Sequence, residues 1–222
     1  MKQRTIKITI IFAAILLLAT SEALAYVVFD TNGVIQDGDV YDYVYVRNDA
    51  VVDMTGGVVT NVLGAEDWSI VNVSGGVLGR LGSGEFSTLN LSGDMETNEV
   101  EVHNSSTMSM FGGNVGLIEA WNYSTVNLYG GIISEYLKAY GTEDLVISIY
   151  GYGFEYDTLA GDYGGGQLSG FWLDDTPFSI DLFGDPGSPG GAPIDTYSHI
   201  VLIPEPATIL LLGLGAIYIR IS

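Results

Sequence analysis

The pattern of apolar and polar residues repeats along the middle of the chain, and every repeat is anchored on a glycine. Six segments share this pattern, beginning with VVDMTGG, which ends at Gly57. Apolar residues stand two and four positions before each anchoring glycine. This alternation with period two predicts a β-strand with one buried face. The anchoring glycines are Gly56, Gly75, Gly93, Gly112, Gly130 and Gly151, at steps of 19, 18, 19, 18 and 21 residues.

The apolar positions define the expected core. The pairs before the glycines are Val52/Met54, Val71/Val73, Leu89/Leu91, Met108/Met110, Val126/Leu128 and Ile147/Ile149. A second, weaker strand appears in several repeats, with pairs Val44/Val46, Val100/Val102, Ile118/Ala120 and Leu137/Ala139. The glycines between the two strands supply a turn or bulge.

Two short strands in 18–19 residues cannot bury an apolar face alone, but stacked copies can. We therefore expect an all-β fold, a parallel β-solenoid (β-helix) of about six or seven coils, with like residues stacked in columns about 4.8 Å apart. An antiparallel sandwich is the alternative, although it gives no reason for the same residue type to recur at matched positions. Handedness and the number of faces per coil stay open.

The repeat array needs ends that differ from its middle, because an open end of stacked strands recruits other chains. Residues 26–183 are expected to form the solenoid with its caps. Within them, Tyr26–Asp39 caps the start, and Glu143–Phe183 forms the last coil and the C-terminal cap. Residues 184–203 are expected to form a linker rich in glycine and proline at Gly184–Pro193 and then a short strand at Ser198–Ile203.

The N-terminus has the features of an export signal. Three basic residues precede an apolar run at Ile8–Ala19, and Ala23-Leu24-Ala25 is the small-x-small pattern that a signal peptidase cuts. The basic residues are Lys2, Arg4 and Lys7. Residues 1–25 are therefore expected to be a signal peptide, and the exported chain to begin at Tyr26.

The C-terminus carries a second hydrophobic signal. Pro204-Glu205-Pro206 precedes the apolar run Ala207–Ile219, which Arg220 follows. Thirteen residues of helix cover about 20 Å, less than the ~30 Å hydrocarbon core of a bilayer. The motif, the run and the arginine resemble the tail of PEP-CTERM proteins, which are exported bacterial proteins whose tail is recognised by the membrane enzyme exosortase. Residues 204–222 are then a sorting signal, and an ordinary short membrane anchor is the alternative.

The resemblance implies a precursor with an apolar helix at each end, processed by a signal peptidase and an exosortase-like enzyme. Such a protein is held in the membrane by its C-terminal segment before processing, and then lies at the cell surface or outside the cell. The repeat unit also resembles the Gly-Gly repeats of autotransporter adhesin passengers, and the β-helical repeats common among PEP-CTERM proteins.

Charge and composition narrow the possible partners. The segment from Tyr26 to Ile203 carries 25 acidic residues and three basic ones, which are Arg47, Arg80 and Lys138. Such a surface repels nucleic acid, and this excludes nucleic-acid binding. The chain has no cysteine, which rules out disulfides and thiolate sites. We expect no cofactor.

The outward positions of the strands carry the candidate ligand-facing residues. One column contains Thr88, Thr107 and Thr125, beside a column of asparagine and serine that includes Asn72, Asn90 and Asn127. The column just before the glycines contains Phe111, Tyr129 and Tyr150. These rings offer a surface for a sugar chain, or they simply stabilise the stack through ring contacts. The polar columns order water, bind polysaccharide hydroxyls, or form a solvated ladder of amides.

Catalysis finds little support in the sequence, so we expect no catalytic residues and no metal site. His103 and His199 are far apart in sequence, and Asp174-Asp175 lies in a strand-like segment whose neighbours point to opposite faces. The three basic residues take different positions in their repeats. The expected protein is a non-enzymatic, exported surface or extracellular-matrix protein with a structural or adhesive role. A polysaccharide-binding or polysaccharide-cleaving β-helix, with an extracellular polysaccharide as partner, is the alternative.

Overall fold

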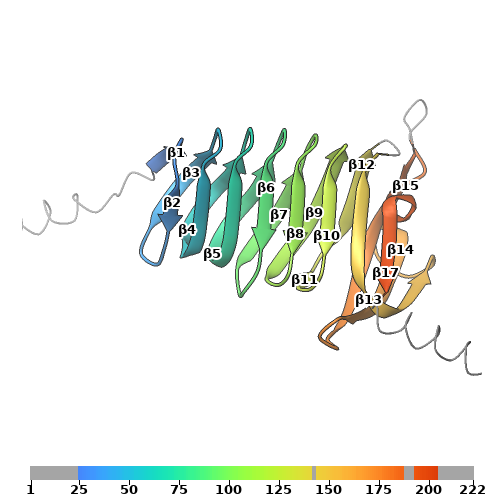
Figure 1. Cartoon of the computed structure of the whole chain (residues 1–222). Helices are drawn as coiled ribbons and strands as arrows, with labels where there is room; N and C mark the ends of the chain where they lie inside the picture. Colours follow the sequence, from blue (N-terminus) through green and yellow to red (C-terminus); the bar gives the residue numbers. More distant parts are fainter. Residues whose placement is uncertain (1–24, 142–143, 188–192, 205–222) are drawn as a thin grey trace, which may run out of the picture.

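The computed structural model describes residues 25–141, 144–187 and 193–204, and these form a rod of stacked β-strands (Figure 1). The architecture is an all-β parallel solenoid with about six regular turns, so the fold class predicted from the repeat is confirmed. The helices expected within residues 1–25 and 207–219 fall almost entirely outside the described residues. Among the described residues, no helix is long and apolar enough to cross a membrane.

Seventeen strands make up the rod. They are β1 (Ala25–Phe29), β2 (Gly33–Ile35), β3 (Val40–Val46), β4 (Val51–Ala65), β5 (Ile70–Ser83), β6 (Thr88–Leu91), β7 (Glu96–Val102), β8 (Thr107–Met110), β9 (Asn114–Asn122), β10 (Thr125–Leu128), β11 (Ile132–Ile133), β12 (Leu137–Gly141), β13 (Val146–Asp157), β14 (Gly164–Trp172), β15 (Pro177–Asp185), β16 (Ile194–Asp195) and β17 (Ile200–Pro204). A short 3₁₀ helix, Thr196–His199, precedes β17.

Each coil contributes one rung to each of two long parallel ladders, and most coils also contribute a two-residue rung to a third, short ladder between them. The rungs of the short ladder are Val40/Tyr41, Val58/Val59, Val77/Leu78, Glu96/Thr97, Asn114/Val115 and β11. The first ladder consists of β2, the first part of β4 and of β5, β6, β8, β10, the first part of β13, and β17. The second ladder consists of β1, β3, the later parts of β4 and β5, β7, β9 and β12. In the first ladder the pairing is in register at the anchoring repeats, as Val71↔Leu89↔Met108 shows.

The core lies inside the coils, enclosed by the three ladders. All twelve inward residues predicted for the first strand of the repeats are fully buried, and the eight predicted for the second strand are at most 2% exposed. Alternation places every second side chain inside, and stacking brings like residues into contact. Burial of a leucine or valine side chain contributes about 1.5–3 kcal/mol, so these columns are the main source of stability.

The bends between strands depend on backbone conformations with positive φ. The second glycine of the Gly-Gly pairs adopts them at Gly57, Gly76, Gly113 and Gly131. A side chain at Gly76 would meet the Gly57 carbonyl oxygen at 2.7 Å, so glycine is required for space as well as conformation. The opposite turn repeats a left-handed residue in five successive coils: Asn48, Asp67, Glu85, Asn104 and Asn122.

The C-terminal end departs from the solenoid. Strands β13, β14 and β15 form an antiparallel meander, and Trp172 closes the core there, with its indole Nε1 donating to the Gly131 carbonyl at 3.2 Å. The short strand expected at Ser198–Ile203 is β17, which pairs with β13 and adds a rung to the first ladder. At the other end, residues 26–39 contribute β1 and β2, which are the first rungs of the two ladders.

Candidate functional site

The polar columns on the first ladder form as the sequence predicts. Thr88, Thr107 and Thr125 stack in register, and their hydroxyls make no hydrogen bond within the described part of the chain. In the neighbouring column, the Asn72 amide donates to Asp53 Oδ1 and the Asn90 amide donates to Asn72 Oδ1, both at 2.8 Å. The asparagine ladder is therefore internally bonded, whereas the threonine hydroxyls are free to bind water or a ligand.

The aromatic residues before the glycines stack on one another. The ring centroids of Phe111 and Tyr129 are 4.7 Å apart with planes 6° from parallel, and those of Tyr129 and Tyr150 are 4.1 Å apart at 18°. A hydrogen bond with Tyr150, followed by burial, raises the pKa of the Tyr129 hydroxyl. The rung spacing of about 4.8 Å is close to the contact distance of stacked rings, and this explains the column.

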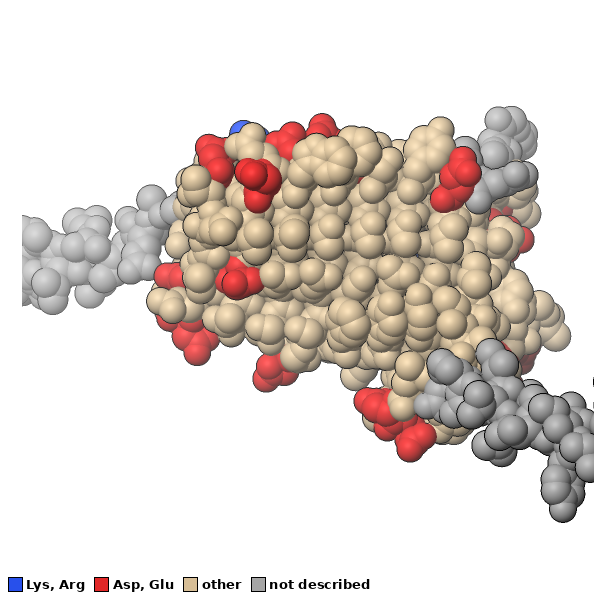
Figure 2. Space-filling view, viewed as in Figure 1, with Lys and Arg blue, Asp and Glu red and all other residues tan. Residues whose placement is uncertain are grey.

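The first-ladder face is nearly uncharged in a strongly acidic protein. Among the three outward columns that flank the glycines, Asp53 is the one charged residue. Figure 2 views the rod from this side and shows acidic atoms mostly at the margins of the face. The face therefore offers hydroxyl, amide and aromatic groups without a strong field, which suits an uncharged ligand.

The second-ladder face has the opposite character. All three basic residues of the described chain lie on it, each paired with a glutamate of a neighbouring coil. The distances are 2.8 Å for Arg47–Glu66, 3.3 Å for Arg80–Glu101 and 3.2 Å for Lys138–Glu119. The prediction that these residues occupy different columns holds, yet the structure brings them onto one face of mixed charge. The sequence had not indicated such a surface.

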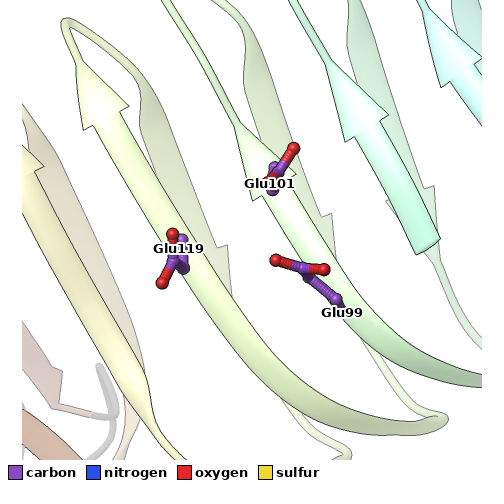
Figure 3. Close-up of side chains that lie close together, drawn as sticks. All are labelled: Glu99, Glu101 and Glu119. Carbon is purple, nitrogen blue, oxygen red and sulfur yellow. The ribbon is translucent and has the colours of Figure 1, made fainter.

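Three carboxylates gather on this face. Glu99 and Glu101 project from β7 and Glu119 from β9 (Figure 3), and one carboxylate oxygen of each lies within 4.8 Å of the others. Burial, followed by repulsion from Glu101, raises the pKa of Glu99. His103 Nε2 is 3.6 Å from Glu101 Oε2. The cluster thus has one carboxyl whose pKa is raised beside two carboxylates that pair with cations, a combination that acid–base chemistry uses.

A metal ion would find an incomplete set of ligands in this cluster. Three carboxylates supply fewer oxygens than the six to eight that Ca²⁺ takes. Two of them, Glu101 and Glu119, already accept from Arg80 and Lys138. The existing cations therefore compete with any metal for the same oxygens.

Aromatic side chains also stack on the second-ladder face. The rings of Trp121 and Tyr140 are 3.9 Å apart, and His103 stacks on Trp121 at 5.5 Å. The Lys138 ammonium lies 4.2 Å from the centre of the Tyr140 ring and 4.1 Å from that of Phe183. The sequence analysis did not predict this stacking, because Trp121 and Tyr140 do not keep a constant distance from the anchoring glycines.

The remaining candidates have local structural roles. Asp174 and Asp175 lie in the turn between β14 and β15, so the expectation of a strand segment is wrong there. Asp174 accepts from Thr176, whose side chain and backbone amide lower the pKa of that carboxyl. Asp175 Oδ1 accepts from the Tyr152 hydroxyl at 2.6 Å. Among the expected sorting residues, Pro204 ends β17, whereas Glu205, Pro206 and Arg220 lie outside the described residues.

Comparisons with known proteins do not assign the chain to a family. No protein-family model matches the chain, and no match is found among curated proteins or among solved structures.

Proposed function

We propose that this protein is an exported rod of the cell surface or extracellular matrix, with a structural or adhesive role and no catalytic activity of its own. The observation that carries the proposal is the regular, nearly uncharged first-ladder face, on which threonine hydroxyls recur in three successive coils and asparagine amides in three coils. Repetition gives many weak contacts, and many weak contacts on a rigid rod give strong attachment through effective concentration.

Export and sorting belong to the same proposal. The signal-peptide pattern before Tyr26 and the Pro-Glu-Pro tail after β17 support delivery by a signal peptidase and an exosortase-like enzyme. Strand β17 pairs with β13 at the C-terminal end of the rod (Figure 1), and the tail follows β17 directly in the sequence. A protein sorted in this way is held at the membrane by its last segment until the tail is removed.

An extracellular polysaccharide is the proposed partner of the first-ladder face. Retention of the full-length protein on insoluble polysaccharides (cellulose, chitin and cross-linked dextran) tests this. Changing Phe111, Tyr129 and Tyr150 together to Ser should abolish retention and lower the thermal transition only modestly. Changing Asp174 and Asp175 to Asn should leave retention intact. Equal retention of the aromatic triple variant and the parent protein would contradict the proposal.

The carboxylate cluster favours a second candidate, a polysaccharide-cleaving enzyme. Glu99, whose pKa is raised by burial, would act as general acid, and Glu101, which pairs with Arg80, would be the second carboxylate. Release of reducing sugar ends from any of the same polysaccharides by the parent protein, and its loss in Glu99→Gln, would support this candidate over the structural role.

A further inference from the structure

The aromatic column of the first ladder is stacked so tightly that its rings cannot bind a sugar with their faces. Phe111, Tyr129 and Tyr150 come from successive rungs, and their planes are within 18° of parallel to their neighbours. Ring centroids 4.1–4.7 Å apart leave no room for a ligand between them. The column presents ring edges to solvent along its length, and open faces are possible only at its two ends.

The two ends of the column differ. At the C-terminal end, Ile203 of β17 is in register with Tyr150 and occupies the next position of the column. At the N-terminal end, the preceding rung carries Ser92, and the one before it carries Ser74. Phe111 is 56% exposed, whereas Tyr129 and Tyr150 are half-buried. The open ring face of this column is therefore the N-terminal face of Phe111.

Polar groups border the open face. Ser92 and Ser74 are small enough to form a floor beside the ring, and Asn90 and Asn72 run parallel to them in the next column. The Asn90 amide donates to Asn72, but its own carbonyl oxygen accepts no hydrogen bond in the described structure. The site therefore combines an exposed aromatic face with serine hydroxyls and asparagine amides. Such a combination suits a sugar ring, which has an apolar C–H face and polar hydroxyls.

We propose that the surface formed by the open face of Phe111 and by Ser92 and Ser74 is a subsite for the terminal residue of an uncharged glycan. The C–H face of a pyranose packs against the Phe111 ring, and its hydroxyls bond to the serine and asparagine side chains. The glycan extends from there over Ser74 toward Thr55, along the serine and asparagine columns. The nearby carboxylate of Asp53 disfavours an anionic sugar. This inference rests on the proposed polysaccharide partner and specifies where and how its chain end is held.

Substitutions in and around this subsite distinguish binding at Phe111 from binding elsewhere on the aromatic column. Phe111→Leu retains apolar volume without a ring, and should weaken binding at least tenfold. Ser92→Tyr retains all three original rings but adds a fourth over the open face, so it should block binding as well. Tyr150→Ser changes the covered end of the column and should leave the affinity within twofold. Circular dichroism and thermal unfolding verify that each variant is folded.

The measurement is calorimetric titration of the full-length protein, in a detergent without a sugar headgroup, with cellohexaose, laminarihexaose and maltohexaose. Binding of at least one hexasaccharide, with the variant pattern above, supports the subsite. If Ser92→Tyr and Phe111→Leu bind like the parent while the triple serine variant does not, the subsite is wrong and the polysaccharide-binding proposal stands. If the parent protein binds none of the three sugars, or the triple variant binds normally, the polysaccharide-binding proposal fails together with the subsite.

Discussion

The side-chain amide of Asn90 donates a hydrogen bond of 2.8 Å to the side-chain carbonyl of Asn72, although the two residues are 18 positions apart in the sequence. The bond exists because one coil of the solenoid takes 18 residues at this point and places like residues one above the other. The next residue, Leu91, points the other way and is completely buried. Two adjacent residues therefore test which face of the strand is inside.

Replacing Leu91 by Asp should destabilise the fold severely, by about 4 kcal/mol or more, because an unpaired charge would be buried in the core. Replacing Asn90 by Asp should cost about 1 kcal/mol, because the change removes one partly buried hydrogen bond. Chemical denaturation of both variants gives the two values. A similar loss for both would mean that the inward and outward faces have been exchanged.

At acid pH, Glu99 should no longer lower the stability of the folded protein. Burial raises the pKa of this carboxyl above its ordinary value of 4.5, so the folded protein binds this proton more tightly than the unfolded chain. Stability from this group is present at acid pH and is lost as the pH rises through the folded-state pKa. Glu99→Gln should therefore raise the melting temperature at pH 7 by roughly 1–2 °C, and the gain should vanish below pH 4.5.

Glu119→Gln is the matched control for that experiment. Glu119 accepts from Lys138 at 3.2 Å in a largely buried pair, so its neutralisation leaves the ammonium without its partner. This variant should be less stable than the parent protein at pH 7. If both substitutions raised the melting temperature, the gain would come from the lower net negative charge of the protein and not from the local contacts of Glu99.

Two glycines of one strand should respond to alanine in opposite ways. Gly76 has φ +94°, and a Cβ there would meet the Met54 Cε and the Gly57 carbonyl, so Gly76→Ala should cost at least 1–3 kcal/mol. Gly82 lies in the same strand β5 with open space around its Cβ position, so Gly82→Ala should be neutral or stabilising by up to ~1 kcal/mol. Thermal unfolding of the two variants checks this, and destabilisation by Gly82→Ala would contradict the register.

The first ladder could be predicted from the sequence because its residues keep a constant distance from the anchoring glycine. Val71, Leu89 and Met108 all stand four positions before it, and they pair directly in the structure. Period-two alternation and a repeat of 18–19 residues were enough to assign the buried face, the polar columns and the stacked rings.

The second ladder could not be read in the same way. Glu101 and Lys138 stand eight positions after their glycines and Glu119 stands seven, yet the three share one column. A bulge between the strands absorbs one residue in alternate coils, as the register shift between Val59 and Val62 illustrates. An alignment on the glycines therefore assigned these charged residues to different columns, although the structure places them in one. The antiparallel cap also lacks the repeat, and this is why the Asp174–Asp175 turn was assigned to a strand.

The intact mass of the mature protein, isolated from the surface of a host that has an exosortase, tests the proposed exported and sorted protein most directly. We predict a chain that begins at Tyr26 and lacks residues 207–222, because we propose that the short apolar run behind Pro204-Glu205-Pro206 is a signal that is recognised and removed. Loss of the exosortase should leave the tail in place. A surface form that still carries residues 207–222 in the presence of the enzyme would contradict the sorting signal and favour a simple membrane anchor.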